Sequence, residues 1–81
     1  MKEHKVTVYK TLTCSWCHKT EEFLKQHKIK FTSVDVGKDY RAATEMIRKS
    51  GQQGVPVIDI DGNIVVGFDE PELRKLLKIS N

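Results

Sequence analysis

The sequence predicts an α/β fold of order βαβαββα, in which a four-stranded mixed sheet is flanked by three helices. Short segments of alternating β-branched residues are separated by segments with helical periodicity. The tight-turn sequence "DGN" joins the last two strands. The 81 residues are 38% hydrophobic and 31% charged, which is ordinary for a globular domain. We therefore expect a single domain over residues 1–81.

The first strand and helix lie before residue 28. "KVTVY" (5–9) alternates around Val6 and Val8 and predicts a strand. From Ser15 the periodicity becomes helical. One side of this helix is formed by Trp16, Cys17, Thr20, Phe23, Leu24 and His27. "FTSVDV" (31–36) predicts a second strand, which a helical connection makes parallel to the first.

The second helix is predicted over "YRAATEMIRKS" (40–50). Gly37 interrupts the preceding strand, and Asp39 can cap the helix. Gly51 stands where a helix C-terminus favours a left-handed residue. The residues expected to face inward are Tyr40, Ala43, Met46 and Ile47.

The last third of the chain predicts a β-hairpin and a helix. "VPVIDI" (55–60) and "IVVGF" (64–68) are strands, antiparallel because a tight turn joins them. Asp69 with Glu72 three residues later, and Pro71 between them, marks a helix start. The buried stripe of this helix is expected to be Leu73, Leu76 and Leu77. Helices are expected on both faces of the sheet.

Charge and hydropathy limit the classes of partner. The net charge is +3, but both signs alternate along the chain, and no basic stripe with aromatic residues suggests a nucleic-acid surface. The first ten residues lack the apolar run of a signal peptide, and no segment approaches membrane-spanning length. We expect a cytoplasmic protein that has no membrane partner. Structural disulfides are rare in the cytoplasm. A bridge between Cys14 and Cys17 would close a very short loop and would stabilise the protein by only about 2 kcal/mol.

Both cysteines lie in "CSWCH" (14–18), a pattern compatible with a redox dithiol, half of a zinc site or covalent haem attachment. They fall at a strand-to-helix junction, where free N–H groups and the helix dipole stabilise a thiolate. Zinc would need two further ligands, and His4 and His27 have no paired spacing. Covalent haem would need export and a fold that wraps the porphyrin. The pattern therefore favours a redox pair in which Cys17 can attack a sulfur bound to Cys14.

Three segments, "VYKTLTCSWC" (8–17), "GVPVIDIDG" (54–62) and "GFDEPEL" (67–73), give the chain its resemblance to glutaredoxin-like proteins of the thioredoxin superfamily. The resemblance implies a thioredoxin-like fold. It implies that Cys14 is the nucleophile and Cys17 the resolving thiol. It also implies a cis peptide bond between Val55 and Pro56, facing the active site.

The resemblance further implies a substrate or glutathione site. Its residues would be Lys10, Thr13, Ser15, Trp16, Val55, Pro56, Gly67, Phe68 and Asp69. Gly67, Phe68 and Asp69 match the loop that holds the γ-glutamyl end of glutathione in glutaredoxins. Simpler interpretations are an edge-strand proline at Pro56, a helix cap at Asp69 and partial packing of Trp16.

Several positions depart from the glutaredoxin pattern. Thr11 stands where glutaredoxins carry a basic residue, and Lys10 is one place further back. Gly54 replaces a common threonine, Val66 replaces a glycine and Phe68 replaces a small residue. These changes weaken glutathione contacts. The short length and Phe68 favour the related redoxins that take electrons from thioredoxin reductase, including the NrdH type that serves ribonucleotide reductase.

The sequence thus predicts a thiol–disulfide oxidoreductase. Its substrates would be disulfide-containing proteins or glutathione mixed disulfides. The external reductant is expected to be glutathione or NADPH with thioredoxin reductase, and ribonucleotide reductase is a candidate partner. The protein is expected to be a monomer without bound cofactor or metal.

An alternative function follows from Ser15, which replaces the proline most common at this position in glutaredoxins. Relatives without that proline can share a [2Fe–2S] cluster across a dimer. Cys14 and glutathione would be the cluster ligands in this alternative. The weakened glutathione contacts make it the less favoured of the two hypotheses.

Overall fold

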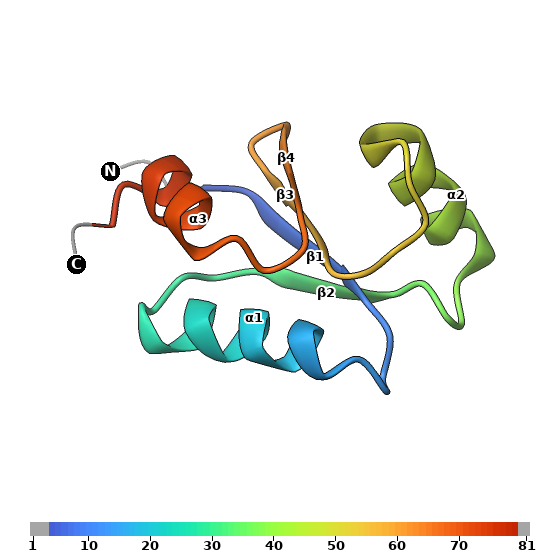
Figure 1. Ribbon diagram of the computed structural model, residues 1–81, viewed down its shortest axis with the longest axis horizontal. Coiled ribbons are helices and arrows are strands. Elements are labelled where there is room, and N and C mark those ends of the chain that lie inside the picture. The colour runs from blue at the N-terminus through green and yellow to red at the C-terminus, as the bar shows by residue number, and fades with distance from the viewer. Residues whose placement is uncertain (1–3, 80–81) are drawn as a thin grey trace.

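The computed structural model describes residues 4–79, and its elements follow the predicted order (Figure 1). The elements are β1 (Val6–Lys10), α1 (Ser15–Gln26), β2 (Thr32–Asp35), α2 (Tyr40–Ser50), β3 (Val57–Ile60), β4 (Asn63–Val66) and α3 (Glu70–Leu77). The predicted βαβαββα order is therefore confirmed. All helix starts agree with the sequence to within one residue because each has a capping side chain at the preceding position.

The four strands form one mixed sheet in the order β2-β1-β3-β4. β1 pairs parallel to β2, with Thr7 opposite Thr32, and antiparallel to β3, with Val8 opposite Ile58. β3 and β4 form the predicted antiparallel hairpin. Because β1 and β3 are antiparallel neighbours, with Tyr9 opposite Val57, the end of β1 that leads to Cys14 lies beside the start of β3, which follows Pro56.

Helices cover both faces of the sheet, as predicted, and the alternation of side chains along each strand separates two apolar clusters. α1 and α3 contribute to the larger cluster, whose buried members are Val6, Val8, Phe23, Leu24, Ile58, Ile60, Val65, Leu73 and Leu77. α2 covers the opposite face, where the buried members are Tyr9, Met46 and Val57. The helix that carries the cysteines is thus anchored on the more extensively packed face.

The strands are shorter than predicted or shifted by one residue. β1 starts at Val6 and β2 spans Thr32–Asp35, against predictions of 5–9 and 31–36. β3 begins only at Val57, so Val55 and Pro56 precede the strand instead of forming its first two residues. β4 spans Asn63–Val66, because Gly67, at φ 77°, turns the chain out of the sheet.

The prediction for the inward face of α2 is wrong at two positions. Tyr40 is 83% exposed and Ile47 is 38% exposed, whereas Met46 is buried. The cluster beneath α2 is small, so only a narrow stripe of the helix reaches the sheet. Ile47 lies about 100° around the helix from Met46, which places it outside that stripe. The predicted left-handed Gly51 is confirmed, with φ 76°.

Candidate active site

Cys14 is the N-cap residue of α1, directly before the first helical turn. Its Sγ accepts a hydrogen bond from the backbone N–H of Cys17, with 3.1 Å between nitrogen and sulfur. The positive end of the helix dipole and this N–H both favour negative charge on the sulfur. Cys14 is only half-buried. Its sulfur is therefore accessible to a partner that approaches from solvent.

Cys17 has the opposite environment in the same helical turn. It is fully buried, and both cysteines are free thiols in this structure. Burial, followed by a hydrogen bond with Cys14, raises the pKa of the Cys17 thiol to about 12. Cys17 therefore remains a protonated, neutral thiol at neutral pH.

Trp16 lies between the cysteines in the sequence and is 55% exposed. Its ring centroid is 6.2 Å from that of Phe68, and Lys19 Nζ lies 4.7 Å from the ring centroid. Phe68 also contacts Phe23, at 5.7 Å between centroids, which connects the surface rings to the α1 face of the core. Trp16 therefore combines partial packing with an exposed aromatic surface, so that both of the interpretations made from the sequence apply to it.

A pocket of about 250 Å³ brings together residues from three separate segments: Trp16, Val55, Pro56, Gly67 and Phe68. The Val55–Pro56 peptide bond is cis. The N–H of Gly67 donates to the carbonyl of Pro56 at 2.8 Å, which joins the two segments opposite α1. None of the five lining residues is charged, so the surface beside the cysteines is predominantly apolar.

The remaining site residues named from the sequence do not line this pocket. Ser15 and Thr13 flank Cys14 and are exposed. Asp69 caps α3, where its Oδ1 accepts from the N–H of Glu72 at 3.3 Å. Lys10 is the last residue of β1. It lines neither this pocket nor the pocket formed by Thr11, Thr13 and Lys38. The capping role proposed as the simpler interpretation of Asp69 is thus confirmed.

A second pocket, of about 350 Å³, lies against the loop before Cys14. It is lined by Thr11, Leu12, Thr13, Asp35, Gly37 and Lys38. Its walls therefore include a lysine from the connection between β2 and α2, whereas Thr11 supplies no charge.

Two interactions near the site were not anticipated from the sequence. His18 Nε2 lies 3.0 Å from the carbonyl of Leu12, which ties the loop before Cys14 to α1. The side chain of Gln52 forms two hydrogen bonds with the backbone of Gly54. Neither has a sequence signal, because the first depends on how the loop folds back and the second on the conformation of an irregular segment.

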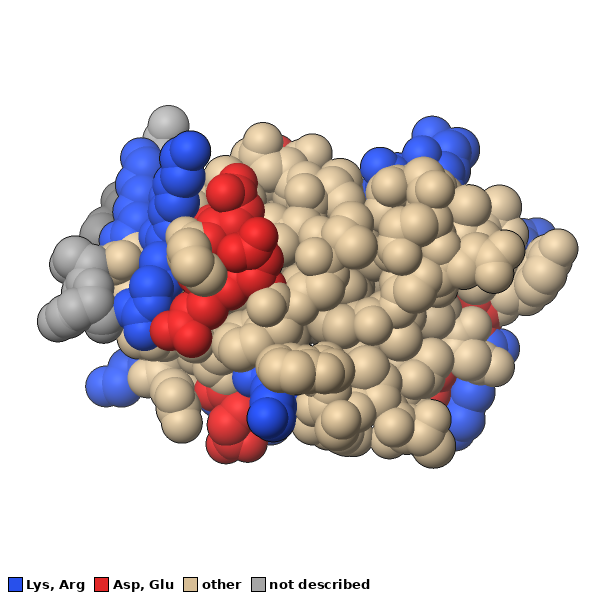
Figure 2. Space-filling model, viewed as in Figure 1, with Lys and Arg blue, Asp and Glu red and all other residues tan. Residues whose placement is uncertain are grey.

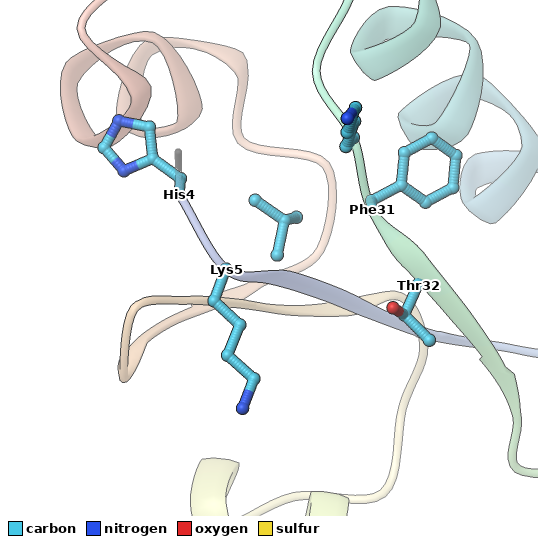
Figure 3. A pocket seen from close by; sticks show the side chains of 6 residues that line it. His4, Lys5, Phe31 and Thr32 are labelled. Atoms are coloured by element: carbon cyan, nitrogen blue, oxygen red, sulfur yellow. The ribbon is translucent and has the colours of Figure 1, made fainter. Parts of the chain in front are cut away.

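The opposite end of the sheet also has a pocket, of about 220 Å³ (Figure 3). It is lined by His4, Lys5, Val6, Lys30, Phe31 and Thr32, around the start of β1. Cys14 follows the other end of β1, so this pocket is separate from the cysteine site. Within residues 4–79, no group of three or more His, Cys, Asp or Glu side chains could hold a metal ion. None of the helices in that range is long and apolar enough to cross a membrane.

The chain is similar to glutaredoxins both in a comparison with protein families and in a comparison with individual sequences. The family model for glutaredoxin matches residues 6–65. A glutaredoxin-like 8.6 kDa protein from the rubredoxin operon of Clostridium pasteurianum is 49% identical over 73 residues, covering 90% of this chain and 97% of the relative. The glutaredoxin-like protein NrdH of Lactococcus lactis is 31% identical over 71 residues, covering 88% of this chain and 97% of the relative.

Solved structures show the same similarity in three dimensions. The crystal structure of a glutaredoxin from Archaeoglobus fulgidus has a TM-score of 0.85 at 28% identity, covering 91% of this chain and 86% of that one. A variant of a thioredoxin-like protein has a TM-score of 0.89 at 34% identity, covering 99% of this chain and all of the other.

Proposed function

This chain belongs to the glutaredoxin family and has a thioredoxin-like fold, and we propose that it reduces disulfides through a Cys14–Cys17 dithiol cycle. Membership supports thiol–disulfide oxidoreductase activity in general. The observation that carries the specific cycle is the contrast within one helical turn. Cys14 is partly exposed, and its Sγ accepts a hydrogen bond from the backbone N–H of Cys17. Cys17 is buried, and burial raises its pKa to about 12.

In the first step the Cys14 thiolate attacks one sulfur of a substrate disulfide. A bond forms between Cys14 Sγ and that sulfur, and the other substrate sulfur leaves as a thiolate, which takes up a proton. In the second step Cys17 loses its proton and attacks Cys14 Sγ, which releases the remaining substrate thiolate. The protein becomes oxidised by two electrons and the substrate disulfide becomes two thiols. An external dithiol, or two monothiols, then restores the reduced protein.

The cause of the raised pKa of Cys17 also explains the order of these steps. Part of the increase comes from the hydrogen bond and the charge of Cys14, after the larger effect of burial. When Cys14 forms the mixed disulfide it loses its negative charge, so this part of the increase disappears. Cys17 then ionises more readily, at the moment when its attack is required.

The surroundings of the cysteines favour proteins over free glutathione as redox partners. The pocket that contains Trp16 and Val55 has no charged lining residue, whereas glutathione carries two carboxylates. Over β3, β4 and the segment leading into β3, Figure 2 shows a largely uncharged surface, while charged side chains gather over α3. We therefore expect disulfide-containing proteins as substrates and a thioredoxin reductase as reductant, with ribonucleotide reductase one candidate substrate.

Two serine variants test the cycle. Cys14→Ser should abolish disulfide reduction, because no nucleophile remains at the accessible position. Cys17→Ser should accumulate a mixed disulfide at Cys14, detectable by mass spectrometry of the intact protein. Full reductase activity in Cys14→Ser would overturn the assignment of roles. A visible absorption band in the purified protein would instead support the [2Fe–2S] alternative.

The reductant is tested by following Trp16 fluorescence while the oxidised protein is reduced. Trp16 lies between the cysteines, so its emission should change when their disulfide opens. Rapid reduction by NADPH with thioredoxin reductase, and slow reduction by glutathione, is the expected result. Rapid reduction by glutathione alone would contradict the preference for a protein reductant.

A further inference from the structure

The segment between α2 and β3 is held by side chains rather than by sheet hydrogen bonds. Gln52 Nε2 donates to the carbonyl of Gly54 at 2.8 Å, and the N–H of Gly54 donates to Gln52 Oε1 at 3.0 Å. Ser50 Oγ donates to the carbonyl of Met46 at 2.7 Å and lies 3.0 Å from the carbonyl of Gln52. One amide side chain thus fixes both backbone polar groups of Gly54.

The residue after Gly54 is Val55, which lines the pocket beside Trp16. On the far side of Val55, the carbonyl of Pro56 accepts from the N–H of Gly67 at 2.8 Å. Strand β3 starts only at Val57. Val55 therefore lies between two fixed points, the Gln52 contact before it and the Gly67 contact after it.

Glycine at position 54 leaves room for the end of the Gln52 side chain and does not serve an unusual backbone conformation. The glycines with positive φ among the described residues are Gly51, Gly62 and Gly67. A Cβ added at Gly54 would lie 2.9 Å from Gln52 Oε1, which is too close for a carbon and an oxygen that are not bonded. An alanine at this position would displace the end of the Gln52 side chain, so Gln52 and Gly54 form a matched pair.

We propose that Gln52 is a positioning residue, which orders the Val55 backbone for an extended polypeptide that carries the substrate disulfide. The inference rests on the proposed function and adds to it a preference for disulfides in extended chains. A backbone ordered before binding loses less conformational entropy when a chain aligns with it. A small disulfide with no polypeptide to align gains nothing from this ordering, and this difference provides the test.

The test uses full-length protein that has been reduced with dithiothreitol and desalted. Stopped-flow Trp16 fluorescence follows its single-turnover reaction with two disulfide probes. One is a linear peptide dimer with several residues on each side of its disulfide, and the other is 5,5′-dithiobis(2-nitrobenzoate). The variants are Gln52→Ala and Gly54→Ala, with Gln53→Ala as the matched control because Gln53 is an exposed neighbour of the same type.

Gln52→Ala should raise the half-saturating concentration of the peptide about fivefold to tenfold, the range expected from one or two lost hydrogen bonds. Its maximal rate with the peptide, and its rate with the aromatic probe, should stay within about twofold of the parent. Gly54→Ala should have the same effect, and the double variant should be no worse than either single variant, because both changes remove one contact. Gln53→Ala should match the parent protein.

An unchanged half-saturating concentration in Gln52→Ala would overturn the inference. Equal losses with both probes would also overturn it, because they would indicate a general loosening of the site. Urea unfolding of each variant identifies such loosening independently, and additive losses in the double variant would show that the two residues do not act through one contact. If the reduced parent protein reacted with neither probe, the proposed function itself would fail, a result distinct from a loss confined to the variants.

Discussion

The two walls of the pocket are built in different ways. The α1 wall contributes Trp16 to the pocket lining. Cys14 and Cys17 lie behind it in the same helical turn, where the hydrogen bond between them joins residues only three apart. The opposite wall consists of Val55 and Pro56 from one loop and of Gly67 and Phe68 from another. A backbone hydrogen bond between Gly67 and Pro56 joins the two loops of this wall. The contact between the Phe68 and Trp16 rings connects the wall to α1.

This difference separates two tasks. The α1 wall sets the surroundings of the two sulfurs, because Cys14 lies at the helix N-terminus and Cys17 is buried in the same turn, where burial raises its pKa. The opposite wall supplies shape and backbone, and its residues carry no ionisable side chain in the pocket. Changes in the first wall should therefore alter reactivity, whereas changes in the second should alter stability and substrate preference.

The largest expected effect concerns the reactivity of the two thiols. With a pKa of about 12, Cys17 is ionised to only about one part in ten thousand at pH 8. Iodoacetamide at pH 8 should therefore modify Cys14 at least about a hundredfold faster than Cys17, as measured by peptide mass spectrometry over time. Similar rates at both cysteines would contradict the contrast within the α1 wall.

The next effect concerns the contact between the walls. Phe68→Ala removes the ring that contacts both Trp16 and Phe23, and should lower the free energy of unfolding by about 2 kcal/mol. The cost is below that of a fully buried phenylalanine because Phe68 is only half-buried. Urea unfolding measures the change. Leu12→Ala, at a side chain that is 55% exposed, is the control and should change stability by less than about 0.5 kcal/mol.

A smaller effect is expected at Asp69. Asp69→Ala removes the cap of α3 and should cost about 1 kcal/mol, as should Asp39→Ala at the corresponding cap of α2. Asp69→Asn retains a capping oxygen and should therefore be nearly as stable as the parent, by urea unfolding. A slower reduction of Asp69→Asn by glutathione, at unchanged stability, would show that the carboxylate also holds a substrate.

The last effect, which is confined to alkaline pH, is a dependence of stability on the ionisation of Cys17. The pKa of Cys17 is raised in the folded protein, so the folded state retains this proton more strongly than the unfolded state. The contribution of this proton to the free energy of unfolding is fully present below the pKa of an unfolded cysteine, near 9.0. It is lost as the pH rises towards about 12. The reduced parent should therefore lose more stability than Cys17→Ser between pH 9 and pH 11, measured by denaturant unfolding. Parallel pH profiles would contradict this assignment.

Features that depend on neighbouring residues could be predicted from the amino-acid sequence. Cys14, Asp39 and Asp69 cap their helices because a capping side chain reaches an N–H about three positions ahead. Hydrophobic periodicity specifies the order of elements, and the "DGN" turn specifies the hairpin. The location of Cys14 at the start of α1 therefore follows from local sequence.

The meeting of distant segments, in contrast, is a property of the folded chain. Pairing of β1 with β3 brings Trp16 and Pro56 to one pocket, and no local pattern specifies that pairing. The same holds for the exposure of Tyr40 and Ile47, because helical periodicity shows which residues share a face but not how much of the face the sheet covers. The two hydrogen bonds between the Gln52 side chain and the Gly54 backbone depend on irregular backbone geometry, which secondary-structure propensities do not determine. Local hydrogen bonds are encoded over a few residues, whereas the opposing wall exists only after the whole sheet has formed.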